Sequence, residues 1–190
     1  MLKIAIGVPT YGIIKTKTVH SIFKLLKNIP YEWYLLTQTG SYIQDNRVSI
    51  VKMAQKLNSD YLLFVDYDMV FEKNAVEKLL SCDKDIISVN YNMKKFPLET
   101  VVKKADPEGV EIDKQENGLE ECCAVGMGLT LIKMQVFDKV PQPWFFIDTN
   151  KDGSLKYGED MWFCRKARET GFKVWVDPSI KVFHEGDYLF

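Results

Sequence analysis

Apolar positions alternate between strand-like and helix-like spacing through the first half of the chain. A period of two residues is typical of a half-buried strand, and spacings of three and four residues are typical of an amphipathic helix. These patterns predict strands at residues 3–8, 33–37, 61–65 and 85–89, and helices at residues 18–28, 48–57 and 74–80. Strands that alternate with helices indicate an α/β protein with a mostly parallel central sheet flanked by helices.

The second half is less regular. Prolines and glycines among charged residues predict a loop or a short hairpin at residues 94–119. Strands are expected at residues 122–125, 129–133, 172–176 and 180–183, and a helix at residues 159–170 ends before Gly171. The 190 residues are therefore expected to form one domain, residues 1–190, with a first half over about residues 1–92 and a second over about residues 120–190.

Composition excludes some classes of protein. The net charge of −1 argues against a non-specific grip on nucleic acid, which requires a basic surface. No run approaches 18 apolar residues, so we expect a cytoplasmic protein without stable membrane insertion. The four cysteines show no CxxC spacing and are expected to be free buried thiols, with a disulfide or a zinc site as the alternative.

Two aspartates, Asp66 and Asp68, directly follow the apolar strand predicted at residues 61–65. Ligands of open α/β sheets bind beyond the carboxyl ends of the strands, where loop side chains converge. Paired carboxylates suit Mg²⁺ or Mn²⁺, which commonly share such oxygens with substrate phosphates. A solvated turn that contains two acids is the alternative, because so short a motif also occurs by chance.

Four segments in order resemble the GT-A glycosyltransferases, especially small members of the glycosyltransferase 2 group. They are the first strand and turn at residues 6–11, the strand with the DxD motif at residues 61–68, the xED motif at residues 158–160, and the closing strands with a histidine at residues 174–186. The resemblance covers nearly the whole chain. It implies a GT-A fold, with a nucleotide-sugar-binding first half and an acceptor-binding, catalytic second half.

The resemblance also assigns donor-binding residues. Pro9, Thr10 and Tyr11 would line the pocket for the base and ribose, although a simple β-turn explains them equally well. Arg47 would contact the donor phosphates with its fork of donors, or it is an ordinary surface charge. Asp66 and Tyr67 would also contact the donor, with Asp66 toward the ribose or a coordinated water.

In this interpretation the metal ligands are Asp66, Asp68 and His184, and the cofactor is Mn²⁺ or Mg²⁺. Asp160 would be the general base that takes the proton of the acceptor hydroxyl, with Glu159 beside it. Both acids also suit the first turn of a helix, where they would cap it. His184, for its part, could be structural or exposed.

The resemblance also implies that the acceptor lies near Gly126 and Gly128, where missing side chains leave room. Trp144 could stack on an acceptor sugar, or it could belong to the core. The implied reaction moves a sugar from a nucleotide-diphosphate sugar, with UDP favoured on frequency, to an acceptor hydroxyl with inversion. A glycan, a protein and a modified nucleic acid all remain open as acceptor, as does a homodimer. Small stand-alone enzymes of this kind are often encoded by viruses.

Two alternatives stay open. A nucleotidyltransferase would use a nucleoside triphosphate on a similar sheet, although the Gly-rich, basic signature of such enzymes is missing after the first strand. The stretch from Asp148 to Glu159 fits the EF-hand calcium-loop pattern, which would suit a non-catalytic calcium-binding or sugar-binding module. The prolines before Asp148 do not supply the entering helix that an EF-hand needs.

Overall fold

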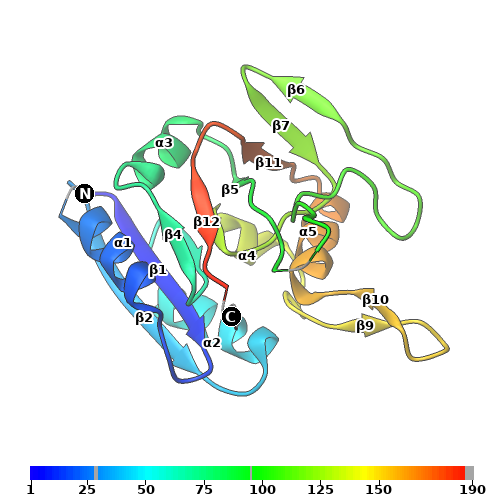
Figure 1. Ribbon diagram of the computed structural model, residues 1–190, viewed down its shortest axis with the longest axis horizontal. Coiled ribbons are helices and arrows are strands. Elements are labelled where there is room, and N and C mark those ends of the chain that lie inside the picture. The colour runs from blue at the N-terminus through cyan, green and yellow to red at the C-terminus, as the bar shows by residue number, and fades with distance from the viewer. Residues whose placement is uncertain (28–29, 95, 187–190) are drawn as a thin grey trace.

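The structure is a computed structural model that describes residues 1–27, 30–94 and 96–186. An eight-stranded sheet forms its centre (Figure 1). In spatial order its strands are β2 (Glu32–Thr39), β1 (Lys3–Thr10), β3 (Tyr61–Val65), β8 (Leu129–Lys133), β5 (Ile86–Val89), β11 (Val174–Asp177), β7 (Leu119–Cys122) and β6 (Lys114–Glu116).

Strand direction places the loops that carry the candidate residues. β1 pairs in parallel with β2 and β3, and β5 pairs in parallel with β11. β8 is antiparallel to β3 and β5, and β7 is antiparallel to β11 and β6, so only β7 and β8 run against the other strands. The mostly parallel sheet is thus confirmed, and the carboxyl ends of β1, β3 and β5 lie at one edge.

Helices cover both faces of this sheet. They are α1 (Thr16–Leu26), α2 (Ile43–Lys56), α3 (Ala75–Ser81), α4 (Gln135–Lys139) and α5 (Glu159–Glu169). The buried residues of α1 and α3 share one apolar cluster with Ile4 and Ile6 of β1, whereas those of α2, α4 and α5 share another with Ala5. Successive residues of a buried parallel strand point to opposite faces, and both faces are covered here. The prediction of a central sheet flanked by helices is therefore confirmed.

Two short sheets complete the chain (Figure 1). β4 (Met69–Phe71) pairs antiparallel with β12 (Val182–His184), which brings the end of the described chain beside the loop that follows β3. β9 (Asp148–Thr149) and β10 (Leu155–Tyr157) form a hairpin that projects beside α5.

Most predicted elements are present, with shifts of a few residues. The strand predicted at 122–125 ends at Cys122, and the predicted end of the first helix at Asn28 lies outside the described residues. A loop or short hairpin was predicted at residues 94–119, of which Lys95 is outside the described residues, and the hairpin of β6 and β7 covers the end of this range and continues to Cys122. Its turn, Asn117–Gly118, has positive φ at both residues, which a type I′ hairpin turn requires.

The four cysteines are free thiols, as predicted, and three of them are buried. Burial raises the pKa of Cys122 to about 12, which keeps this thiol protonated. Within the described parts of the chain, none of the helices is long and apolar enough to cross a membrane.

Candidate active site

Arg47 of α2 joins the two acidic motifs of the sequence. Its Nη2 donates to Oδ1 of Asp66 at 2.9 Å, and its Nε donates to Oε1 of Glu159 at 3.4 Å. The guanidinium lies over the Phe64 ring, 5.2 Å from the centroid, and its side chain is 3% exposed. Burial lowers the pKa of Arg47, but the surrounding carboxylates outweigh it and raise that pKa above its usual value. The alternative of an ordinary surface charge is therefore wrong, whereas the expected contact of Arg47 with donor phosphates stays a prediction.

Asp68 has cationic or imidazole partners at both carboxylate oxygens. His184 Nε2 lies 3.1 Å from Oδ1, and the ammonium of Lys94 contacts Oδ2. The Asp68 side chain is only 2% exposed. Burial alone raises the pKa of Asp68, but the hydrogen bonds from His184 and Lys94 outweigh it and leave that pKa below its usual range. Asp68 is thus an ionised, nearly buried carboxylate held in place by positive charge and by hydrogen bonds.

Pairing of β4 with β12 explains why His184 reaches Asp68. His184 is registered opposite Met69, the residue after Asp68, and Glu185 N donates to the Asp68 carbonyl oxygen at 2.8 Å. The other ring nitrogen, Nδ1, lies 3.3 Å from the carbonyl oxygen of Asn92. Because both nitrogens have partners, the orientation of the imidazole ring is fixed.

Asp160 lies in the first turn of α5 and is half-buried. Burial raises its pKa to about 6, and the charge of Glu159 acts in the same direction. The backbone N–H of Met161 donates to Oδ1 at 2.7 Å, and this bond and Arg47 oppose the rise. A carboxylate with a pKa near 6 is a stronger base than an ordinary aspartate and is still ionised at neutral pH.

The predicted donor residues of the first turn divide into buried and exposed ones. Pro9 and Thr10 are buried, and Thr10 Oγ1 accepts hydrogen bonds from the N–H groups of Gly12 and Ile13 at 3.1 and 3.0 Å. Tyr11 is 57% exposed, and its ring meets Tyr67 edge-on with centroids 6.3 Å apart. The two tyrosines thus form the accessible aromatic part of this edge.

Gly126 and Gly128 lie against the buried ring of Tyr91, which follows β5. A Cβ at either position would approach the Tyr91 hydroxyl oxygen to 2.4 or 2.5 Å. That oxygen accepts the N–H of Gly128 at 2.8 Å, and the Tyr91 ring packs edge-on against His184 with centroids 5.6 Å apart. The room left by the two glycines is therefore filled by Tyr91, which contradicts their expected role beside an acceptor sugar.

Trp144 is a core residue, and its expected role in stacking on an acceptor is wrong. It is 4% exposed, packs edge-on against Phe137 and donates from Nε1 to the Val140 carbonyl oxygen at 2.8 Å. Two other aromatic side chains of this part of the chain are more accessible: Trp162 of α5, which is half-buried, and Phe146, which is 45% exposed. Their ring centroids are 5.1 Å apart.

The stretch that fits a calcium loop is a β-hairpin and not part of a helix–loop–helix. Asp148 begins β9, and Asp152 Oδ1 accepts both the N–H and the hydroxyl of Ser154 at 3.0 and 2.6 Å. Glu159, the last position of the pattern, is bound to Arg47. The hairpin therefore lacks the geometry of an EF-hand.

Among the described residues, no group of three or more His, Cys, Asp or Glu side chains is arranged to hold a metal ion. Asp68 and His184 are in contact, whereas Asp66 is turned toward Arg47. This pair fits a Mg²⁺ or Mn²⁺ ion that takes its remaining ligands from substrate phosphates and water, as such ions commonly do. It does not fit a cation held by the protein alone.

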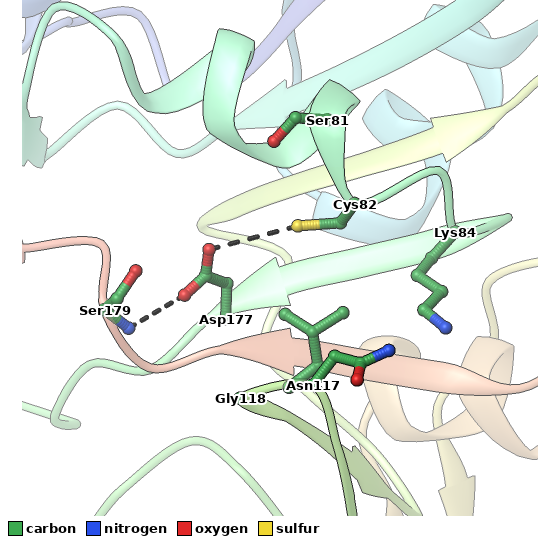
Figure 2. A pocket seen from close by; sticks show the side chains of 8 residues that line it. Ser81, Cys82, Lys84, Asn117, Gly118, Asp177 and Ser179 are labelled. Carbon is green, nitrogen blue, oxygen red and sulfur yellow. Dashed lines mark hydrogen bonds between the residues drawn. The ribbon is translucent and has the colours of Figure 1, made fainter.

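A separate cavity of about 440 Å³ lies between the end of α3, the β6–β7 turn and the loop after β11 (Figure 2). In it, Cys82 Sγ is 4.0 Å from Oδ2 of Asp177, and Ser179 N donates to Oδ1 of Asp177 at 2.8 Å. None of the site residues predicted from the sequence lines this cavity.

Comparison with known proteins agrees with this architecture. No protein-family model and no curated protein sequence matches the chain. Among solved structures, A197 from STIV superposes with a TM-score of 0.68 at 20% identity, over 98% of this chain and 87% of that one. A UDP-glucose pyrophosphorylase complexed with UDP-glucose gives a TM-score of 0.54 at 9% identity, over 96% and 92%.

The chain has a GT-A-like fold. Residues 1–349 of TarS from S. aureus share it with a TM-score of 0.53 at 13% identity, over 96% of this chain and 60% of that one. Asp66 and Asp68 directly follow β3, at the carboxyl edge beyond which open α/β sheets generally bind their ligands.

Two residues of this edge were not foreseen from the sequence. Lys94 contacts Asp68. Tyr91 packs against Gly126, accepts the N–H of Gly128 and stacks edge-on against the ring of His184. Neither belongs to a motif with recognisable spacing. The only available signal is their position just after β5, a strand whose carboxyl end joins the same edge.

Proposed function

We propose that this protein is a glycosyltransferase that uses a nucleotide-diphosphate sugar, with UDP as the favoured nucleotide, and a divalent cation, Mn²⁺ or Mg²⁺. The observation that carries the proposal is the raised pKa of Asp160, about 6, on the helix whose Glu159 is joined to the DxD loop through Arg47. A base of this kind is needed when the nucleophile is a hydroxyl group.

The donor would lie at the carboxyl edge. The exposed ring of Tyr11 and the half-buried ring of Tyr67 would offer aromatic surface for the base, and Asp68 with His184 would hold the cation beside the diphosphate. A bound divalent cation would neutralise the negative charge that develops on the leaving diphosphate. Arg47 would keep Asp66 and Glu159 at fixed positions behind this site.

In the transfer step, the acceptor oxygen forms a bond to the anomeric carbon while the bond from that carbon to the diphosphate oxygen breaks. The diphosphate leaves with the electron pair, and Asp160 takes the proton of the hydroxyl. Attack opposite to the leaving group inverts the anomeric centre. Trp162 and Phe146, whose rings pack against each other, would offer aromatic surface for an acceptor.

A donor panel tests the proposal. The protein is incubated with Mn²⁺ and UDP-, GDP- or CDP-sugars, with candidate acceptors, and the products are followed by mass spectrometry. A glycosyltransferase releases a nucleoside diphosphate, and Asp160→Asn abolishes this release. Pyrophosphate formed from a nucleoside triphosphate and a sugar phosphate would instead establish a nucleotidyltransferase, and consumption of no nucleotide would contradict both.

A further inference from the structure

The ammonium of Lys94 is paired with Asp68, and a divalent cation would compete with it for this carboxylate. Its Nζ contacts Oδ2 of Asp68, while Oδ1 of the same carboxylate lies against His184. Both oxygens of this nearly buried group are therefore engaged. A divalent cation held by Oδ1 and His184 would lie a few ångströms from the ammonium on Oδ2, and the two positive charges would repel each other, so the cation would bind more readily once Lys94 moves away.

The segment that carries Lys94 folds back over the site. Met93 N donates to the Glu99 carbonyl oxygen at 2.8 Å and Val101 N to that of Tyr91 at 3.0 Å, and Asn92 is bridged to Thr100. The Lys94 ammonium also lies 5.4 Å from the centroid of the Tyr67 ring. Its side chain is 33% exposed, so the long stem can swing outward while the backbone stays paired.

We propose that Lys94 is a built-in counter-cation of Asp68 that makes binding of the divalent cation depend on the nucleotide diphosphate. This inference rests on the proposed function, because it concerns the same site. Without nucleotide, Lys94 neutralises Asp68 and keeps the affinity for the free metal ion low. When a diphosphate arrives, the displaced ammonium pairs with a phosphate oxygen, so that the metal ion and Lys94 both gain a partner.

The inference predicts a loss of coupling when Lys94 is replaced. Mn²⁺ is titrated into the full chain by calorimetry and by electron paramagnetic resonance, first alone and then with saturating UDP. In Lys94→Met we expect Mn²⁺ alone to bind roughly tenfold tighter than in the unaltered protein, and UDP to increase Mn²⁺ affinity by a smaller factor. Lys94→Arg, which keeps the charge, should stay close to the unaltered protein.

Lys133→Met is the matched control, because Lys133 pairs with Asp83 at 2.9 Å on a different loop. It should leave the affinity for Mn²⁺ unchanged, and thermal unfolding checks that every variant is folded. If Lys94→Met binds Mn²⁺ alone no more tightly than the unaltered protein, or loses Mn²⁺ binding, the inference is overturned. Failure of UDP to bind any variant would instead count against the proposed function, because the titration with Mn²⁺ alone tests Lys94 separately.

Discussion

Arg47 and Asp66 are joined by a hydrogen bond of 2.9 Å between Nη2 and Oδ1, which ties the first aspartate of the DxD loop to helix α2. The same guanidinium reaches Glu159 of the second acidic motif. One enclosed cation thus joins the DxD loop to the first residue of α5, from a distant part of the chain, and replacing it should affect both stability and chemistry.

We expect Arg47→Met to lower the free energy of unfolding by about 3 kcal/mol, because it leaves two partly buried carboxylates without their counter-charge. Urea denaturation measures the change. Lys133→Met removes a more exposed ion pair and should cost less than about 1 kcal/mol. Equal effects of the two substitutions would show that the contacts of Arg47 with Asp66 and Glu159 do not stabilise the fold beyond an exposed ion pair.

The pKa of Asp160 predicts how activity depends on pH. The base acts only when it is ionised, so the transfer rate should rise with pH through about 6 and then level off. Arg47 lowers this pKa, and Arg47→Met should therefore move the midpoint to higher pH. Rates measured from pH 4.5 to 8 with saturating donor test this, and a rate independent of pH in that range would rule out Asp160 as the base.

The same shift predicts that Asp160 weakens the fold at neutral pH. The folded-state pKa of about 6 lies above the ordinary value of 3.8, so the folded protein binds more protons than the unfolded chain between these values and stability falls as pH rises through them. Asp160→Asn should therefore be more stable than the unaltered protein by about 2–3 kcal/mol at pH 7. The difference should disappear near pH 4.

Urea denaturation at pH 4, 5.5 and 7 measures this gain. The control is Asp138→Asn on α4, an exposed acid whose replacement should change stability by less than about 0.5 kcal/mol. An Asp160→Asn variant that is less stable at pH 7 would show that the carboxylate is kept for the fold and not for chemistry.

Tyr91 and Gly126 should behave as a coupled pair. A Cβ on Gly126 would lie 2.4 Å from the Tyr91 hydroxyl oxygen. The next nearest atoms, Cβ of Val101 and Cζ of Tyr91, would lie 3.1 and 3.2 Å away, so most of the crowding comes from the hydroxyl group. Gly126→Ala is therefore expected to cost about 1–3 kcal/mol through overpacking, and Tyr91→Phe should recover part of that loss. Strictly additive effects in a double-mutant cycle of urea denaturation would disprove the contact.

Gly128 offers the comparison. There the Tyr91 ring carbon Cζ at 2.7 Å and the sulfur of Met69 at 3.0 Å would still crowd a new Cβ after the hydroxyl is removed. Tyr91→Phe should therefore rescue Gly128→Ala less than it rescues Gly126→Ala.

His184 should matter for nucleotide binding only when a cation is present. We expect His184→Ala to reduce the affinity for UDP with Mn²⁺ on the order of tenfold or more, because the cation loses a ligand. The affinity for UDP alone should change little. Phe183→Ala replaces the neighbouring, 66% exposed side chain of β12 and serves as control. A loss of UDP binding that is the same with and without Mn²⁺ would show a structural role for His184.

The sequence was sufficient to predict the architecture because the local spacing of apolar residues indicates strands and helices. The strand at residues 61–65 was predicted with the bounds it has in the structure, and so was the start of the helix at Glu159. The short strand β4 was missed, since three residues carry no period. Its pairing with β12 nevertheless positions His184.

The site was harder to predict because its contacts join distant residues. Asp68 and His184 are 116 positions apart, and Arg47 and Glu159 are 112 apart. The family resemblance placed these side chains at one edge, but it could not tell that Arg47 is enclosed or that Tyr91 fills the space beside the glycines. The role expected for Trp144 at the acceptor was wrong, because the sequence alone does not show whether a tryptophan in a loop lies at the surface or in the core.

The central claim is that the carboxyl edge binds a nucleoside diphosphate together with a divalent cation. Calorimetric titration of UDP, GDP and CTP, each with and without Mn²⁺, into the unaltered protein and into Asp66→Ala/Asp68→Ala tests it most directly. We predict that a nucleoside diphosphate, with UDP favoured, binds in the presence of Mn²⁺, and that the double variant loses this binding while remaining folded. Binding that is equally strong in the double variant, or that needs no cation, would contradict the account.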